Sequence, residues 1–291
     1  MNHRQPRILV TGASGQLGSL VIDHLLKTTP AAQIGATVRS AAKAAALSAR
    51  GVNVFVADYD KPGTLDAAFA GVKRLLLISS SEIGSRFRQH RNAIEAARRA
   101  GVELLVYTSL LHADSSPLGL AEEHRQTEAA LRGSGISHVI LRNGWYTENY
   151  AASVPAALAH GVFLGAAGEG RISSAARADY AEAAAKILTS SEDQSGRVYE
   201  LAGDESYTLS GFASEIARQS GKPISYKNLP EAGFKAALTG AGLPEALATL
   251  LADSDAGAAK GALFDEGRQL SRLIGRPTTP AAATISAALK A

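Results

Sequence analysis

Short apolar runs alternate with longer amphipathic segments through the first half of the chain. The runs are rich in Val, Ile and Leu and nearly continuous, which is typical of strands that are covered on both faces. The segments between them carry apolar residues at helical spacing. This pattern predicts six strands, at 7–11, 33–38, 53–57, 74–79, 103–108 and 137–141, and five helices, near 15–28, 41–50, 62–70, 86–100 and 119–134.

A strand–helix alternation this regular predicts right-handed crossovers and a parallel sheet between two helical layers. The rhythm ends after Arg142, where a Gly- and Ala-rich stretch precedes one more helix at 178–189 and one more strand at 198–202. From Ser206 the pattern is helical, with a short extended piece at 223–226. We therefore expect an α/β fold: a doubly wound parallel Rossmann sheet with a small, mainly helical C-terminal lobe.

The first predicted strand runs directly into a glycine-rich loop that opens a helix. Thr11 is followed by Gly12, Ala13, Ser14, Gly15, Gln16, Leu17 and Gly18. Gly12 permits the tight turn, Gly15 lets the backbone approach a pyrophosphate, and Gly18 allows the helix to pack on the sheet. The phosphates would bind the free N–H groups of the helix N-terminus. The loop therefore predicts a dinucleotide-binding site.

The second predicted strand ends on a basic residue where NAD sites place a carboxylate for the ribose 2′-hydroxyl. Here the residue is Arg39, and Lys43 follows one helical turn later. A guanidinium binds a 2′-phosphate in a planar, bidentate way, so the expected cofactor is NADPH. Lys43 fits this role or a solvated surface position equally well. Asp58 and Tyr59 stand where a contact to the adenine rim is usual, although Asp58 could equally cap the next turn.

These motifs divide the chain into two expected domains. Residues 1–143 with 176–203 form an NADP-binding Rossmann domain, and 144–175 with 204–291 form a small substrate-side lobe. A length of 291 residues, 46% of them hydrophobic, is enough for one large or two modest cores.

Composition excludes several classes of function. The chain has no cysteine, which excludes disulfides, thiolate catalysis and iron–sulfur clusters, and its seven histidines show no metal-ligand spacing, so we expect no metal. The net charge of +3 is small, and the basic run at 86–91 opens an amphipathic helix and is expected to be a solvated face, so no nucleic-acid partner is expected. With neither an export signal nor a membrane-spanning stretch in view, we expect a cytoplasmic protein without a membrane partner.

Four longer blocks carry a resemblance to a known family. They read LLISSS at 76–81, YTSLLHAD at 107–114, LRNGWY at 141–146 and ADSD at 252–255. Together with the glycine spacing and Arg39, they make the chain similar to the NmrA-like group of atypical short-chain dehydrogenases/reductases, and within it to the bacterial NAD(P)H:quinone oxidoreductases. The resemblance implies a small-molecule quinone as substrate and NADPH as hydride donor, with no flavin.

The chain departs from the wider superfamily at its catalytic pair. Carbonyl reduction there uses Tyr-x-x-x-Lys on the fifth helix, and aligning that helix places Leu120 and His124 at the two positions. A ketone reduced by hydride leaves a strongly basic alkoxide that needs an acid, whereas a quinone leaves a delocalised, weakly basic anion. The missing pair therefore favours direct hydride transfer by positioning alone. His124 itself is open between a substrate-side role and an ordinary helix surface.

Open parallel sheets bind ligands beyond the carboxyl ends of their strands, which adds candidates for the pocket. They are Ser79, Ser80 and Ser81 after the fourth strand, Thr108 and Ser109 after the fifth, and Asn143, Gly144, Trp145 and Tyr146 after the sixth. Asn143 could bind the nicotinamide amide or a quinone oxygen, or form a loop turn. Tyr146 could stack on the quinone or protonate it, and Trp145 fits either the pocket or a core position between lobes.

Two other functions belong to related proteins. A non-catalytic NADP(H)-sensing regulator of the NmrA type would also lack the Tyr-x-x-x-Lys pair. The second alternative is an NADPH-dependent flavin or isoflavonoid-type reductase, but the sequence contains no residue that specifically indicates this activity. The quinone-reductase blocks at 141–146 and 252–255 favour the enzyme. An oligomer, for instance a dimer, is compatible with the sequence.

Overall fold

The computed structural model describes residues 6–290, so residues 1–5 and 291 of the two expected domains lie outside the described residues. Its main sheet has seven strands in the order β3-β2-β1-β4-β5-β6-β8. They are β1 (Ile8–Val10), β2 (Ile34–Val38), β3 (Asn53–Val56), β4 (Arg74–Leu77), β5 (Leu104–Leu110), β6 (His138–Asn143) and β8 (Val198–Leu201). The registered pairs are parallel, with Ile8 between Ile34 and Arg74. The predicted doubly wound Rossmann sheet is therefore confirmed.

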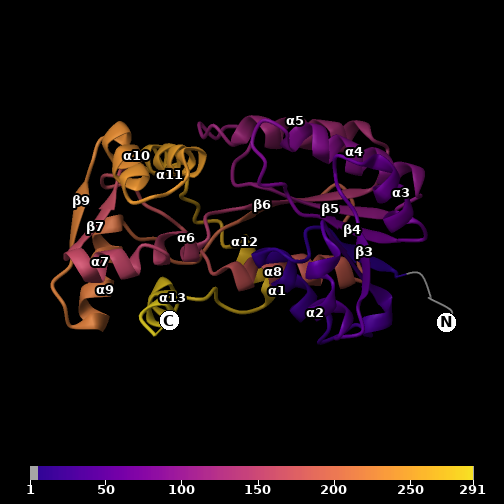
Figure 1. Ribbon diagram of the computed structural model, residues 1–291, viewed down its shortest axis with the longest axis horizontal. Helices are drawn as coiled ribbons and strands as arrows, with labels where there is room; N and C mark the ends of the chain where they lie inside the picture. Colours follow the sequence, from indigo (N-terminus) through magenta and orange to yellow (C-terminus); the bar gives the residue numbers. More distant parts are fainter. Residues whose placement is uncertain (1–5, 291) are drawn as a thin grey trace. The chain divides into compact units, whose positions relative to one another are not determined.

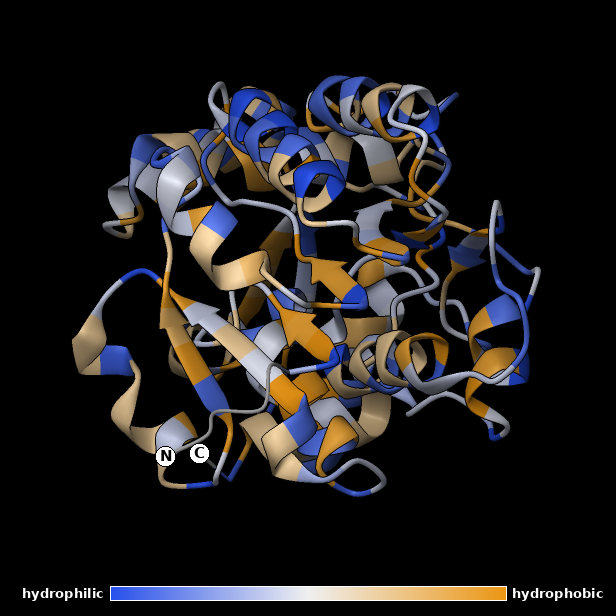
Figure 2. Cartoon of the chain, turned by 90° about the vertical axis from the view of Figure 1, so that its right-hand side faces the viewer, coloured by the Kyte–Doolittle hydropathy of each residue, from blue (hydrophilic) through white to orange (hydrophobic). Residues whose placement is uncertain are grey.

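Helices cover both faces of this sheet. Figure 1 shows α3 (Pro62–Phe69), α4 (Arg86–Arg99) and α5 (Ala121–Gly133) on one side of the strands, and α1 (Gln16–Leu25), α2 (Ala45–Ser48) and α8 (Arg177–Thr189) on the other. The strands are hydrophobic along their length and the helices polar on their outer faces (Figure 2). One buried cluster joins Leu75 and Tyr107 of the sheet to Phe69 and Ile94 of the helices. The near-continuous apolar runs follow from this double covering.

The segment expected as one helix at 41–50 is broken. A 3-10 turn, η2 (Ala41–Lys43), is followed by the single helical turn of α2, in which only Leu47 is buried. Short helices need an apolar face packed on a core to be stable. One buried side chain stabilises only one helical turn, so the helix predicted from the alanine-rich sequence is longer than the one observed.

The chain divides into two compact units. The first contains the described residues up to Ala113, with Glu122–Arg142 and Tyr180–Tyr199. The second contains Asp114–Ala121, Asn143–Asp179 and the described residues from Glu200 onward. The sequence division had left the segment Asp114–Ala121 within the Rossmann domain.

The second unit is mainly helical. Its helices are α6 (Thr147–Ala151), α7 (Val154–His160), α9 (Leu209–Ser220), α10 (Glu231–Gly240), α11 (Glu245–Ala258), α12 (Gln269–Ile274) and α13 (Ala281–Ala288). It also holds a small parallel sheet of β7 (Val162–Gly165) and β9 (Ser225–Asn228), of which the sequence predicted only the extended piece near β9. β7 is only four residues long and ends in glycine, so its sequence pattern is too weak to predict a strand. Its pairing partner, β9, lies about 60 residues away in sequence.

Candidate functional site

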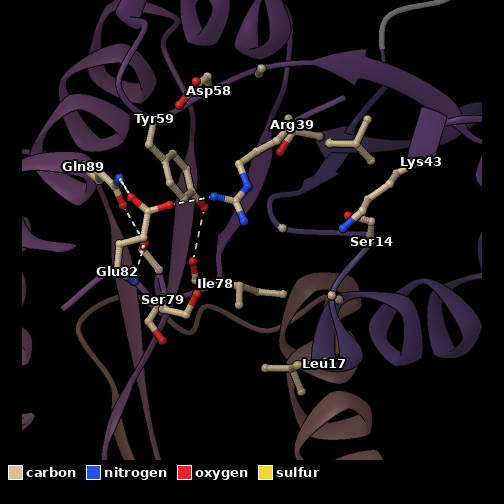
Figure 3. A pocket seen from close by; sticks show the side chains of 18 of the residues that line it. Ser14, Leu17, Arg39, Lys43, Asp58, Tyr59, Ile78, Ser79, Glu82 and Gln89 are labelled. Carbon is tan, nitrogen blue, oxygen red and sulfur yellow. Dashed lines mark hydrogen bonds and ion pairs between the residues drawn. The ribbon is translucent and has the colours of Figure 1, made fainter. Parts of the chain in front are cut away.

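A pocket of about 500 Å³ lies in the first unit, where β1, β2, β3 and β4 end. Figure 3 shows side chains from all four strand ends converging on it. It is lined by Gly12, Ser14, Gly15, Gln16, Leu17, Gly18, Thr37, Val38, Arg39, Ser40, Lys43, Ala57, Asp58, Tyr59, Ile78, Ser79, Ser80, Ser81, Glu82 and Gln89. The pocket therefore includes the switch point of the sheet, between β1 and β4, where open α/β sheets bind ligands.

Most of the residues predicted to bind the cofactor line this pocket. They are Gly12, Ser14, Gly15, Gln16, Leu17, Gly18, Arg39, Lys43, Asp58, Tyr59, Ser79, Ser80 and Ser81. Ala13, Thr108, Ser109, Asn143, Gly144 and Trp145 are not among its lining residues. The sequence did not single out Glu82 or Gln89, which also line it.

The glycine loop is built for close approach of a ligand. Gly12 has φ +59°, and a Cβ on Gly18 would lie 2.4 Å from the Gly12 carbonyl oxygen. Gly15 caps α1 without a side-chain hydrogen bond, and no acidic residue stands in the first turn of the helix. The first N–H groups of α1 thus face the pocket with a partial positive charge. These features fit the pyrophosphate of a dinucleotide.

Thr11 links the end of β1 to the end of β4 and to Tyr59, which follows β3. Its hydroxyl donates to the Leu76 carbonyl at 3.0 Å and accepts from the Ile78 N–H at 3.0 Å. The Tyr59 hydroxyl also donates to Thr11 Oγ1, at 2.6 Å. Burial raises the pKa of Tyr59, although the Thr11 contact and the charge of Arg39 lower it. Tyr59 is therefore a neutral phenol that supports the pocket wall.

Asp58, beside it, performs the turn-capping role that the sequence had left open. Its Oδ1 accepts a hydrogen bond from the Asp60 N–H at 3.0 Å, while its own N–H donates to Thr64 Oγ1 at 3.0 Å. Asp58 also lines the pocket, so capping does not exclude a contact to a bound ligand.

Arg39 and Glu82 form an ion pair across the pocket. Arg39 Nη1 lies 2.6 Å from Glu82 Oε1, and the two side chains are 71% and 44% exposed. The guanidinium reaches from the end of β2 toward Glu82, with Tyr59 beside it and Lys43 on the opposite side (Figure 3). Two cations thus stand at the end of β2, where the ribose 2′ position of a dinucleotide is bound in this fold.

The serine loop after β4 is held from behind by buried polar groups. The Ser79 N–H donates to Thr108 Oγ1 at 2.9 Å, and the Ser80 N–H donates to His90 Nε2 at 2.9 Å. The Arg86 Nε–H donates to the Ser80 carbonyl at 2.5 Å. Thr108 therefore acts as an anchor for this loop. It lies inside β5, which continues to Leu110, two residues beyond the predicted end of the strand.

The face of α4 that the sequence assigned to solvent is partly buried, so that prediction is wrong for three residues. Arg86 is 5% exposed, Gln89 2% and His90 0%. Their burial is tolerated because their polar atoms form hydrogen bonds. Ser80 Oγ donates to Gln89 Oε1 at 2.5 Å, and His90 Nδ1 lies 3.0 Å from Thr127 Oγ1. Burial lowers the pKa of His90 well below its usual value, so this ring is neutral.

His124 is a core residue. The sequence had predicted either a substrate-side role or a position on the helix surface, and the core was not considered. It is 5% exposed, and its Nδ1 lies 2.7 Å from the Tyr107 hydroxyl. Burial, together with the nearby charge of Arg86, lowers the pKa of His124 to about 3. The imidazole is consequently neutral near pH 7 and carries no acidic proton to offer a substrate.

Ser109 is also occupied by a structural partner. It lies within β5, and its hydroxyl donates to Glu128 Oε1 at 2.6 Å. The same carboxylate accepts from Arg142 Nη2 at 2.8 Å. Although burial raises the pKa of Glu128, the hydrogen bonds from Arg142 and Ser109 lower it overall. Ser109 thus completes a buried ion pair between α5 and β6.

The residues from Asn143 to Tyr146 belong to the second unit. Asn143 ends β6, two residues later than expected, and its Oδ1 is buried without a hydrogen-bond partner among residues 6–290. Trp145 is 7% exposed and its ring centre lies 6.2 Å from that of Tyr150. The Arg177 guanidinium lies 4.6 Å above the Tyr146 ring, and the Gly144 N–H donates to the Leu201 carbonyl at 2.7 Å.

Residues 6–290 contain neither a cluster of metal ligands nor a helix that could span a membrane. Within 6–290, no group of three or more His, Asp or Glu side chains has the geometry to hold a metal ion. No helix in this part of the chain combines the length and the apolar character needed to cross a membrane.

Comparisons with known proteins place the chain in a family. Residues 12–191 match the NAD(P)H-binding family model. Quinone oxidoreductase 2 of Escherichia coli K12 is 59% identical over 279 residues, covering 96% of this chain and 97% of that protein. The crystal structure of an Escherichia coli NADPH-dependent quinone oxidoreductase in complex with NADPH has a TM-score of 0.94 at 58% identity, covering 97% of this chain and 99% of the other.

A more distant neighbour shares the fold alone. The negative transcriptional regulator NmrA, solved in complex with NADP, has a TM-score of 0.77 at 16% identity and covers 97% of this chain and 95% of its own. The resemblance expected from the sequence blocks is thus confirmed. The chain belongs to the NAD(P)H-binding family, with the NmrA-like fold and with close relatives among the bacterial quinone oxidoreductases.

Proposed function

We propose that this protein is an NADPH-dependent quinone oxidoreductase. The observation that carries the proposal is the pocket at the strand ends, which combines a ligand-ready glycine loop with Arg39 and Lys43 where a 2′-phosphate would bind. The 59% identity to quinone oxidoreductase 2 of Escherichia coli supports the same activity.

The residues of the pocket divide the work of binding NADPH. The N–H groups that follow Gly15 would hold the pyrophosphate, and Arg39 with Lys43 would neutralise the 2′-phosphate. Ser79, Ser80 and Ser81 form the wall opposite the glycine loop. Because His90 and Arg86 fix this wall from behind, it is set before the ligand arrives and loses little entropy on binding.

When bound, NADPH supplies a hydride, and the quinone becomes a hydroquinone by taking that hydride and one proton. The chain offers no Tyr-x-x-x-Lys acid for this proton, since Leu120 and His124 occupy those positions and His124 is neutral and buried. The hydroquinone anion is weakly basic and can take its proton from water. The protein therefore contributes positioning of the two reactants rather than acid catalysis.

We retain Asn143 and Tyr146 as the candidates for orienting the quinone. The buried and unpaired Asn143 Oδ1 is an acceptor whose desolvation is uncompensated in the ligand-free chain. The carboxamide N–H of the nicotinamide would remove this cost, whereas a quinone has only acceptors and would be oriented by the Asn143 Nδ2–H group and the Tyr146 hydroxyl. Since NADPH is a cofactor of the cell interior, the proposed activity is cytoplasmic, with a small-molecule quinone as the substrate.

The test is a direct assay of the purified protein. Mixed with NADPH and a simple benzoquinone, it should oxidise the cofactor, as followed by the absorbance of the reduced nicotinamide. Replacing the quinone with a simple ketone should abolish the reaction, because a ketone needs the missing acid. Tight NADPH binding without turnover of any quinone would contradict the proposal and favour the regulatory alternative.

A further inference from the structure

We propose that Glu82 reduces the preference of this site for NADPH over NADH by competing with the 2′-phosphate of NADPH for the guanidinium of Arg39. The inference rests on the proposed function, because it concerns the same pocket. It predicts that the natural chain binds NADPH less tightly than its cationic residues allow.

The first step of the argument is the position of the carboxylate. Glu82 and Arg39 both line the pocket, and their 2.6 Å ion pair occupies one nitrogen of the guanidinium. A phosphate that binds Arg39 in a bidentate way needs two nitrogens, so it must displace the carboxylate or share the cation with it. In either case the negative charge of Glu82 stands beside an incoming dianion.

The second step is that Glu82 is held in place from its other side. Gln89 Nε2 donates to Glu82 Oε2 at 2.7 Å, and the Glu82 N–H donates to Ser80 Oγ at 3.2 Å. Gln89 is itself buried, with its amide also donating to Asp60 Oδ2 at 3.0 Å. The Gln89 amide therefore restrains the carboxylate, and a ligand cannot move it away without breaking this network (Figure 3).

The third step concerns NADH, which has a hydroxyl at the 2′ position. A hydroxyl does not require the guanidinium and is not repelled by a carboxylate, so the Arg39–Glu82 pair can remain formed when NADH binds. Glu82 should thus weaken the binding of NADPH and leave that of NADH unchanged. The charge of Glu82 therefore reduces the preference for NADPH over NADH that Arg39 and Lys43 create.

Glu82→Gln tests this assignment because the amide keeps the size of the side chain and removes its charge. An exposed ion pair of this kind contributes enough to change affinity by roughly two- to fivefold, so NADPH should bind that much more tightly to the variant. The dissociation constant for NADH should not change. Both constants are measured by titration calorimetry of the full chain at low and at high salt, and the gain for NADPH should shrink at high salt.

The matched control is Glu103→Gln. Glu103 forms a 2.6 Å ion pair with Lys73, its side chain is 62% exposed, and it does not line the cofactor pocket. This substitution makes the same change in net charge, so it separates a local effect at Arg39 from a general one. In an Arg39→Ala background, Glu82→Gln should lose the part of its effect that comes from competition for the guanidinium, so the gain in NADPH affinity should be smaller than in the natural chain.

The inference is overturned if Glu82→Gln leaves the affinity for NADPH unchanged or weakens it. It is equally overturned if NADH tightens by the same factor, or if the Glu103→Gln control behaves like the variant. These results are independent of the proposed activity, which is assessed by quinone turnover of the natural chain. A natural chain that binds neither cofactor would contradict both the proposed function and this inference.

Discussion

Arg39→Ala should lower the affinity for NADPH and leave that for NADH almost unchanged. A charge-assisted hydrogen bond to a phosphate contributes about 1.5–3 kcal/mol. The ion pair with Glu82 must be given up in exchange, and an exposed pair of this kind is worth about 0.2–1 kcal/mol. The net loss is therefore about 0.5–2.8 kcal/mol, which corresponds to roughly two- to a hundredfold in the dissociation constant.

Arg218→Ala provides the control for this experiment. Arg218 is 69% exposed against 71% for Arg39, and it also forms a 2.6 Å ion pair, with Glu215. It does not line the pocket, so its removal should leave both affinities as they are. Isothermal titration of the natural chain and the two variants with each cofactor gives the comparison. Equal affinity of the natural chain for NADPH and NADH would refute the reasoning at its first step.

Three further substitutions test other parts of the molecule. His124→Ala should slow quinone reduction by less than the roughly 10²–10⁴-fold of general acid–base catalysis, and a larger loss with NADPH binding intact would make His124 the acid. Gly18→Ala should weaken NADPH binding at least about tenfold in a titration, because its Cβ would meet the Gly12 backbone at 2.4 Å, whereas Gly133→Ala, with open space around it, should not. Burial raises the pKa of Asp255 to about 6. The free energy of unfolding of the natural chain relative to Asp255→Asn, measured in urea, should therefore be highest below about pH 4 and fall by about 2–3 kcal/mol by pH 6. A difference that does not change with pH would show that Asp255 does not titrate in this range.

The sheet was predictable because its signal is local. Leu75, Leu76 and Leu77 of β4 are fully buried, so an unbroken apolar run is what covering by helices on both faces requires. The glycine loop and Arg39 were predictable for a similar reason, since each follows its strand at a fixed spacing. The ends of strands were harder to predict, since Ser109 is polar and yet lies within β5, beyond the predicted end at Thr108.

The parts that the sequence did not indicate depend on distant partners. Arg86 and His90 stand in a strongly polar segment, and their burial becomes possible only because Ser80 presents a carbonyl and an N–H to them. Nothing in the sequence distinguishes Glu82 from the other carboxylates, because its partner Arg39 lies 43 residues earlier in the chain and only the fold brings the two together. Pairings of this kind are selected by tertiary structure, and no spacing rule anticipates them.

The hydrogen bond from Ser80 to His90 also fixes where the protons of the buried imidazole reside. A backbone N–H can only donate, so Nε2 must present its lone pair, and the ring proton must be on Nδ1, where it faces Thr127 Oγ1. The Thr127 hydroxyl in turn donates to the Glu123 carbonyl at 2.7 Å. The direction of every bond in this relay, from the serine loop to the backbone of α5, is therefore set. A proton added to the ring would compete with the Ser80 N–H for the single lone pair on Nε2, so in strong acid the serine loop would lose its bond to His90 and keep those to Thr108 and Arg86.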